Sequence, residues 1–394
     1  MFNLTQYSHL KPDSRGWLQI ENICFKDIVD EFGTPVYVYS FKRIKENCMT
    51  LLKTFEKRFK NKIFYSYKTN MNTKLCNIIH ETGIGAEVIS EIELQTALKH
   101  VNPNMIVLDG PHKPLQLVRT AVEHGVNLIN ADSLEELKII NNVAEELKVT
   151  QKVGLTLNPD PDSKIGVALD ESELLLLEKY VNKLNYIKLS ALHCHLRTQN
   201  FDLNDYVEML TRMSGLSKRI KAKTGFEINF FDLGGGLPEA AVIGKKINEL
   251  ADKIRERIED LDLNGEIYFE PGRFIVGDAA VLLTKVLNIK KILDRRWIIV
   301  DAGSNIISPL SKANHRFTVA NRLLEDYSKE YAIGGPLPAS FDVLNRSYCL
   351  PERIEVGDYI GIINAGAYCD SFAIRFGESE TVNVLIENGK VTRI

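Results

Sequence analysis

The sequence lacks the cysteine spacings that bind metal ions. Its six cysteines are scattered without a CxxC pair, at positions 24, 48, 76, 194, 349 and 369. An HExxH zinc motif is also absent. Scattered cysteines of this kind predict reduced thiols in a cytoplasmic protein.

An excess of charge and long apolar runs are missing as well. The formal net charge is −3, and charged residues make up 26% of the chain. Neither nucleic acid nor an anionic membrane is therefore predicted as a partner. No apolar run reaches the ~18 residues of a membrane-spanning helix. Residues 1–17 also lack the basic-then-apolar pattern of a signal peptide, so we expect a cytoplasmic protein.

Neither GxGxxG nor a Walker loop occurs, which argues against a dinucleotide or a nucleoside triphosphate as ligand. Instead, "DLGGGLP" (232–238) follows an apolar run. Three successive glycines leave backbone N–H groups open to a close anion. An ordinary tight turn is the alternative interpretation of this motif.

At 394 residues the chain is long enough for two domains. From residue 62 onward, β-branched and aromatic runs alternate with amphipathic helical segments. The predicted strands are 62–68, 86–90, 105–109, 126–130, 152–158, 187–195, 228–234 and 266–270. Strands coupled to helices in this way predict a (β/α)8 barrel over residues 36–275, with an open doubly wound sheet as the alternative.

The character of the chain changes after residue 275. Short strands with turn signals and little helix follow, and the N-terminal segment resembles this tail. We predict a β-rich domain made of residues 1–35 together with 276–394.

Barrel active sites form at the C-terminal ends of the strands. There the sequence places Lys68 in "FYSYKTN", His193 and His195 in "HCHLRTQ", and Glu270 and Arg273 in "EPGRF". Structural ion pairs are the alternative for Lys68 and for Glu270 with Arg273. Two histidines on one strand face can bind a metal, but no acidic partner has suitable spacing, so we predict none.

Together these groups predict a pocket for pyridoxal 5'-phosphate. A lysine can form an imine, glycines and an arginine can bind one phosphate, and a carboxylate and a flat imidazole can hold a ring.

The motifs resemble those of the fold-type III pyridoxal phosphate decarboxylases, the ornithine/diaminopimelate/arginine decarboxylase family. "YSYKTN" is similar to the family's YAxKAN and "HCHLRTQ" to its HxHxGSQ, while "GGGLP", "EPGR" and "GAY" (366–368) match closely. The motifs occur in the family's order over nearly the whole chain. The resemblance implies an alanine racemase-like fold, a barrel plus a C-terminal β domain. It also implies a homodimer with shared active sites.

The resemblance also implies residue roles. Lys68 should bond covalently to the cofactor, His195 should stack on its ring, and Glu270 should pair with the ring nitrogen. The implied phosphate-binding residues are Thr198, Gly235, Gly236, Arg273 and Tyr368. The substrate amino acid would lose CO2, and protonation of the same carbon would release an amine.

The chain departs from the family where substrate is recognised. The partner subunit of such a dimer usually contributes GPxC(D/E)xxD, whereas "GGPLPASFD" (334–342) has Pro338 for the cysteine and Ala339 for the acid. Proline cannot donate a proton, so Cys369 and His195 become the candidate proton donors. Of the acids in this motif only Asp342 remains.

Two further departures concern charge. Arg197 replaces a small residue in the histidine motif, and Thr156 stands where the family has an arginine. We therefore predict Arg197 and Asp342 as substrate-binding residues, and altered specificity.

Ala339 cannot pair with a distal ammonium, and a buried unpaired charge would weaken binding. Positive charge could instead come from Arg197, His315, Arg316 and Arg375. We expect a carboxylate-bearing conjugate such as citryl-ornithine, from siderophore biosynthesis, as substrate. Ordinary diaminopimelate or ornithine/lysine decarboxylation is the alternative.

An amino-acid racemase and a catalytically silent regulatory homologue are further alternatives. Racemases of this fold typically place arginine at the ring nitrogen, so Glu270 argues against the first. The intact Lys68, Glu270 and Arg273 argue against the second.

Overall fold

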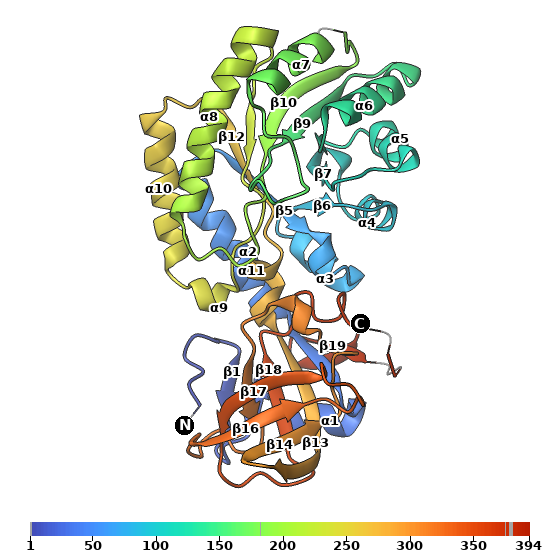
Figure 1. The fold of residues 1–394 in the computed structure, drawn as a ribbon. Helices are drawn as coiled ribbons and strands as arrows, with labels where there is room; N and C mark the ends of the chain where they lie inside the picture. The colour runs from blue at the N-terminus through green and yellow to red at the C-terminus, as the bar shows by residue number, and fades with distance from the viewer. Residues whose placement is uncertain (1, 182, 375, 378–380) are drawn as a thin grey trace. The chain divides into compact units, whose positions relative to one another are not determined.

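A computed structural model describes residues 2–181, 183–374, 376–377 and 381–394 (Figure 1). The chain divides into two compact units. The barrel unit comprises Cys48–Pro238 and Lys245–Gly272, and the β unit comprises Met1–Asn47, Glu239–Gly244 and Arg273–Ile394. Among the described residues, no helix has both the length and the apolar character needed to cross a membrane.

In the described part of the barrel unit, eight parallel strands close on themselves in the order β10-β11-β12-β5-β6-β7-β8-β9. The strands are β5 (Asn61–Ser66), β6 (Gly85–Val88), β7 (Ile106–Leu108), β8 (Leu128–Ala131), β9 (Gln151–Thr156), β10 (Ile187–His193), β11 (Phe230–Asp232) and β12 (Glu266–Phe269). Inside the barrel, Phe64, Val107 and Tyr268 pack in one buried cluster. The predicted barrel is confirmed.

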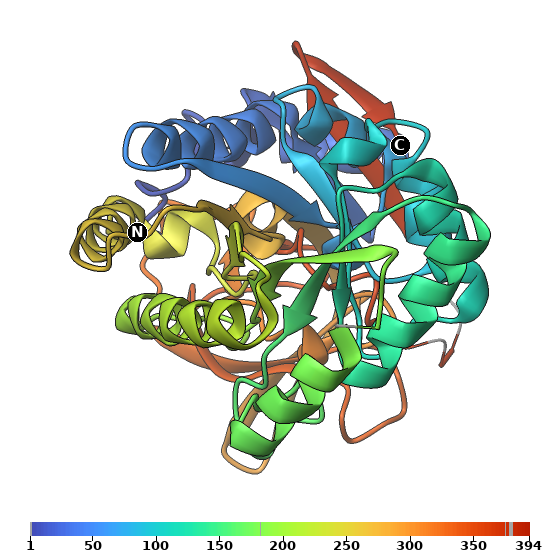
Figure 2. The ribbon, with the colours of Figure 1, turned by 90° about the horizontal axis from the view of Figure 1, so that it is seen from above.

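Helices lie outside the strands, as the view from above shows (Figure 2). They are α3 (Thr73–His80), α4 (Glu91–Ala97), α5 (Leu115–His124), α6 (Leu134–Glu146), α7 (Glu171–Val181), α8 (Asn204–Thr224) and α10 (Lys246–Asp260). Helix α6 shows why these segments are helical: the Ser133 hydroxyl caps the Glu136 N–H, and Leu137, Ile140 and Ala144 bury one face.

Seven of the eight predicted strands extend too far at their C-terminal ends, and the strand predicted over 126–130 stops one residue before the end of β8. The predicted strand 62–68 ends at Ser66, and Lys68 lies in the 3₁₀ turn η1 (Tyr67–Thr69). The predicted strand 187–195 ends at His193, which leaves His195 in the following loop. Tyr67 and Cys194, which follow these strand ends, are buried like strand residues. The apolar pattern therefore does not mark where each strand ends and its loop begins.

The β unit contains a nine-stranded sheet and a three-stranded sheet in the described residues. Its strands are β1 (Leu10–Pro12), β2 (Leu18–Ile20), β3 (Ile23–Cys24), β4 (Val36–Ser40), β13 (Ala280–Ile292), β14 (Arg295–Val300), β15 (Arg316–Val319), β16 (Lys329–Gly334), β17 (Val343–Leu350), β18 (Tyr359–Ile363), β19 (Val382–Glu387) and β20 (Lys390–Arg393). Its helical segments are α1 (Phe25–Phe32), α9 (Ala240–Ile243), α11 (Arg273–Val276), η3 (Gly277–Ala279) and η4 (Pro309–Ser311).

The predicted domain boundary at residue 36 is wrong. Strand β4 pairs with β13 and β19 of the β unit, and its five residues are all buried. Helix α2 (Phe41–Glu56) follows directly, and the units divide within it, after Asn47. Glu239–Gly244 also belongs to the β unit.

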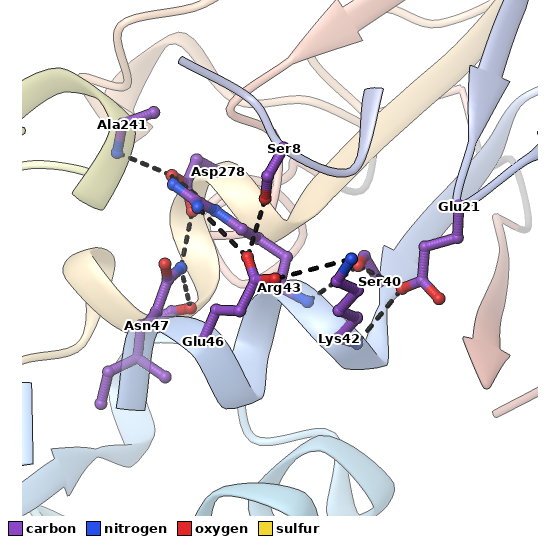
Figure 3. A network of polar contacts seen from close by, with 10 residues as sticks. Ser8, Glu21, Ser40, Lys42, Arg43, Glu46, Asn47, Ala241 and Asp278 are labelled. Atoms are coloured by element: carbon purple, nitrogen blue, oxygen red, sulfur yellow. Dashed lines mark hydrogen bonds and ion pairs between the residues drawn. The ribbon is translucent and has the colours of Figure 1, made fainter. Parts of the chain in front are cut away.

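Asp278 ties separate stretches of the β unit together (Figure 3). Its carboxylate accepts from Arg43 (Nη2, 2.6 Å), from Asn47 (Nδ2, 2.7 Å) and from the Ala241 backbone N–H (2.7 Å). Nearby, Ser8 donates to Glu46 at 2.7 Å. A fully buried carboxylate with this many charge-assisted donors is strongly held, which explains why residues 239–244 stay with the β unit.

Candidate active site

The C-terminal ends of the barrel strands bring ionisable side chains to one mouth. They are Lys68 after β5, Glu87 in β6, Asp109 after β7, His193 at the end of β10, His195 beyond it, Asp232 at the end of β11 and Glu270 after β12. The sequence motifs do not single out Asp109. The signal that could have found it is an acid directly after the buried run Ile106–Leu108.

Lys68 forms an ion pair with Glu87. Its Nζ lies 2.6 Å and 2.5 Å from the two carboxylate oxygens, and the Glu87 side chain is fully buried. A buried carboxylate with a single ammonium between both oxygens holds that ammonium in place. The lysine is therefore held at the mouth rather than extended into solvent.

Glu270 lies in a cluster of buried acids. Its Oε2 is 3.5 Å from His193 Nε2, and its buried Oε1 accepts no hydrogen bond from the described residues. Burial raises the pKa of Glu270 well above its usual value, and the carboxylates of Asp109 and Asp232 raise it further. This carboxyl group therefore needs a proton or a cationic partner.

His195 and the glycine loop contact each other directly. The Gly235 N–H donates to His195 Nδ1 at 3.2 Å, so this N–H is not free for a phosphate. Burial, followed by the charges of Lys68 and His193, lowers the pKa of His195 to about 4. The imidazole is therefore neutral at pH 7, which suits ring stacking but not proton donation.

The glycines around this loop are required by close backbone contacts. A Cβ at Gly235 would lie 2.5 Å from the Glu270 carbonyl oxygen, and one at Gly236 would lie 2.2 Å from that of Arg197. At Gly272 a Cβ would come within 1.8 Å of Thr69 Oγ1. Any side chain at these positions would push the strand-end segments apart.

Arg273, Tyr368 and Cys369 belong to the β unit. The buried Arg273 guanidinium lies 3.2 Å from Glu239 Oε1, donates to the Ser311 carbonyl oxygen, and has its Cζ 5.2 Å from the centre of the Tyr368 ring. Tyr368 adopts a positive φ of 60° and stacks on Phe372. Arg273 is thus fixed in position, but part of its charge is already used by Glu239.

Cys369 is buried, and its thiol donates to the Ala367 carbonyl oxygen at 3.4 Å. Burial raises the pKa of this thiol to about 12, so it stays protonated at neutral pH.

Arg197 and Thr198 lie in the exposed loop after β10. The Arg197 side chain is 64% exposed, and its Nη2 lies 3.1 Å from Asp205 Oδ2. Arg197 therefore remains accessible to a ligand, although one carboxylate already neighbours it.

Asp342 has a structural environment that differs from the substrate-binding role predicted for it. Its buried carboxylate accepts from the Ser304 N–H at 2.6 Å and from the Leu337 N–H at 2.8 Å. Cβ atoms at Gly303 and Gly335 would collide with it. These contacts assign Asp342 to holding its own loops together.

The two described residues of the β unit that are predicted to supply positive charge have different environments. Burial lowers the pKa of His315 to about 4, so this histidine carries no charge at neutral pH. Arg316 lies over the Phe2 ring, with its Cζ 4.5 Å from the ring centre. Arg375 lies outside the described residues.

The barrel unit fits pyridoxal 5'-phosphate. Four features lie at the same mouth: a held lysine, a neutral imidazole, a glycine loop, and a buried carboxyl oxygen that accepts no hydrogen bond from the described residues. The unpartnered Glu270 Oε1 is the informative feature, because a protonated ring nitrogen would supply the donor and the positive charge it lacks.

Comparison with known proteins agrees. The family described as pyridoxal-dependent decarboxylase, pyridoxal binding domain, matches residues 41–277. The chain is 34% identical to a diaminopimelate decarboxylase of Archaeoglobus fulgidus, over 90% of this chain and 88% of the relative. It is 30% identical to that of Aquifex aeolicus, over 99% and 96%.

Solved structures give the same result. Diaminopimelate decarboxylase from Methanocaldococcus jannaschii, in complex with L-lysine, is 27% identical with a TM-score of 0.91, covering 98% of this chain and 95% of that one. The chain therefore belongs to the fold-type III pyridoxal-dependent decarboxylases and is a carboxy-lyase that uses pyridoxal 5'-phosphate.

Proposed function

We propose that the substrate is a free diaminopimelate-type diamino acid. The observation that carries this proposal is the similarity to diaminopimelate decarboxylases along nearly the whole chain. The lysine bound in the similar solved structure is chemically what diaminopimelate becomes when it loses one CO2. This choice replaces the conjugated substrate that the sequence motifs favour.

The charge of the distal end supports the same choice. Diaminopimelate carries a carboxylate beside its distal ammonium, whereas lysine and ornithine end in an ammonium alone. Ala339 offers no carboxylate to such an ammonium, and a zwitterionic end depends less on one. Arg197, which is largely exposed, could bind the distal carboxylate.

The barrel residues have distinct parts in the reaction. When bound, the cofactor supplies the carbonyl group that bonds to an amine and the ring that accepts the electrons left by CO2. Lys68 provides the amine for attachment, and Glu87 binds its ammonium whenever that bond is open. Glu270 would hold the proton at the ring nitrogen, and neutral His195 would cover the ring without adding charge.

We assign phosphate binding to Gly236, Thr198, Arg273 and Tyr368 as part of the same proposal. Gly235 keeps its backbone close to Glu270 and uses its N–H for His195. As proton donor to the substrate carbon we favour the Cys369 thiol over His195, because that imidazole is neutral. We also propose a homodimer in which residues 334–342 reach the partner's active site.

A second candidate substrate is a diamino acid acylated by an acidic group, such as citryl-ornithine. Two residues favour it. Ala339 removes the negative charge that the family has at this position, and the accessible Arg197 adds a positive charge where the family has a small residue. Such a substrate has no distal ammonium at all.

The test is CO2 release from meso-diaminopimelate, L-lysine, L-ornithine and citryl-ornithine at equal concentration. Diaminopimelate should give the highest kcat/KM. Arg197→Ala should lower that value by up to about fivefold, since an exposed ion pair contributes no more than about 1 kcal/mol. Arg197→Lys, which keeps the charge, is the matched control.

Two outcomes would contradict the first candidate. Faster turnover of citryl-ornithine would establish the second, and faster turnover of lysine or ornithine would exclude both.

A further inference from the structure

Four ionisable side chains are buried together at the barrel mouth. Asp109, His193, Asp232 and Glu270 come from the ends of four different strand segments, and each is at most 5% exposed. Glu270 has an assigned partner in the ring nitrogen. Asp109 lies in none of the sequence motifs and has no assigned role.

The contacts of Asp109 link it to Glu270. Its Oδ1 accepts from Asn130 Nδ2 at 2.7 Å, and its Oδ2 lies 4.0 Å from His193 Nε2. The same Nε2 lies 3.5 Å from Glu270 Oε2, and His193 Nδ1 lies 3.1 Å from Thr156 Oγ1. His193 Nε2 therefore faces both carboxyl groups, while its Nδ1 is hydrogen-bonded to Thr156.

The buried carboxyl groups cannot all be ionised, because like charges at low dielectric repel strongly. Burial alone would raise the pKa of Asp109, but the neighbouring His193 and the hydrogen bond from Asn130 are among the causes that hold that pKa below its usual value. Burial and Asp109 raise the pKa of Glu270. The contacts point the same way, because Asp109 Oδ1 accepts from Asn130, which favours its ionised form, whereas Glu270 Oε1 accepts from none of the described residues. Together they favour a proton on Glu270 beside an ionised Asp109.

The other charged groups facing Glu270 act in the same direction. Glu87 on β6 and Asp232 on β11 both raise its pKa, and burial raises the pKa of Asp232 itself to about 6. Asp109 is distinguished from them by its place beside His193 Nε2, the same atom that faces Glu270, and by the Asn130 amide that holds its other oxygen.

We propose that Asp109 is a positioning residue that keeps a proton on Glu270 in the cofactor-free protein, ready for the ring nitrogen. On binding, the Glu270 O–H bond breaks and an N–H bond forms at the ring, so that Glu270 becomes the carboxylate paired with the ring cation. No other reactant is consumed. This inference rests on the cofactor and not on the identity of the substrate.

The test follows the carboxylic acid directly, by infrared difference spectroscopy of the protein labelled with ¹³C-glutamate. At pH 7 the cofactor-free protein should show the C=O stretch of a protonated glutamic acid, and addition of pyridoxal 5'-phosphate should abolish it. Glu270→Gln should lack the band. In Asp109→Asn the band should titrate at a pH lower by at least about one unit, because one of the nearby like charges has been removed.

Asp132→Asn is the matched control, since Asp132 lies at the same mouth after β8 but binds the Gly166 N–H instead. This variant should leave the band unchanged. The measurement on the unsubstituted protein stands on its own if Asp109→Asn does not fold.

Three results would overturn the proposal. The first is a cofactor-free protein without the band at pH 7, and the second is a band whose titration Asp109→Asn does not move. The third is a bound metal, because ligand atoms of Asp109, His193 and Glu270 lie within 4.8 Å of one another. Stoichiometric metal in the purified protein, with the band appearing only after chelation, would assign the cluster to a cation.

Discussion

Lys68 is paired with a buried carboxylate, that of Glu87. Both Glu87 oxygens hold the Lys68 ammonium at the mouth of the barrel, where it can react only with a molecule bound there. We expect that molecule to be the cofactor. We predict that the purified protein is yellow because of bound pyridoxal 5'-phosphate. Borohydride should remove the cofactor's absorption band and leave the cofactor as a stable covalent label on Lys68. Lys68→Ala should abolish both the band and the label. Peptide mapping that finds the label on another lysine would contradict the assignment.

At the residue scale, sequence motifs predict types and positions but not environments. Lys68, His195 and Glu270 are visible in the sequence because each lies in a recognisable motif at a strand end. Asp109 is not, because only closure of the barrel brings β7, β10 and β12 close enough to bury it beside His193. His315 looks cationic in the sequence, yet burial keeps it neutral.

At the element scale, the loops of the β unit depend on Asp342. Its carboxylate joins the loop after β14 to the loop after β16 through the N–H groups of Ser304 and Leu337. Asp342→Asn should destabilise the protein by about 1–3 kcal/mol, the cost of leaving a buried donor without its acceptor. Thermal unfolding of the cofactor-loaded protein measures this.

The same variant separates a structural from a substrate-binding role. Asp342→Asn should leave the KM ratio between diaminopimelate and lysine unchanged below the unfolding temperature. A changed ratio with unchanged stability would restore Asp342 as a substrate ligand.

Elements were predictable where local pattern and burial agree. The barrel strands are short runs of β-branched and aromatic residues between helices, and their existence follows from the sequence. The assignment of β4 does not, because its run "VYVYS" is equally suited to either unit and only its pairing with β13 and β19 decides. The prediction therefore failed at a boundary rather than in the fold.

At the scale of the whole molecule, three loops of the β unit suggest a docking surface. Ser304 donates its N–H to Asp342 and accepts from the Ile374 N–H at 3.1 Å, so the three loops are tied together. They expose Leu310, Phe341, Phe372 and Phe376. Apolar side chains exposed in neighbouring loops are typical of surfaces that bind another protein, and the proposed dimer would bury them.

Phe341→Asp should therefore disrupt the proposed homodimer. Phe341 is 55% exposed within residues 334–342, the segment proposed to reach the partner. Loss of a buried aromatic contact worth about 2 kcal/mol would weaken dimerisation about thirtyfold. Sedimentation velocity across a concentration series should show a shift toward monomer together with lower activity. Leu293→Asp, at an 88% exposed position between β13 and β14, is the control and should change neither. A fully active monomer would exclude shared active sites, because each site would then be complete within one chain.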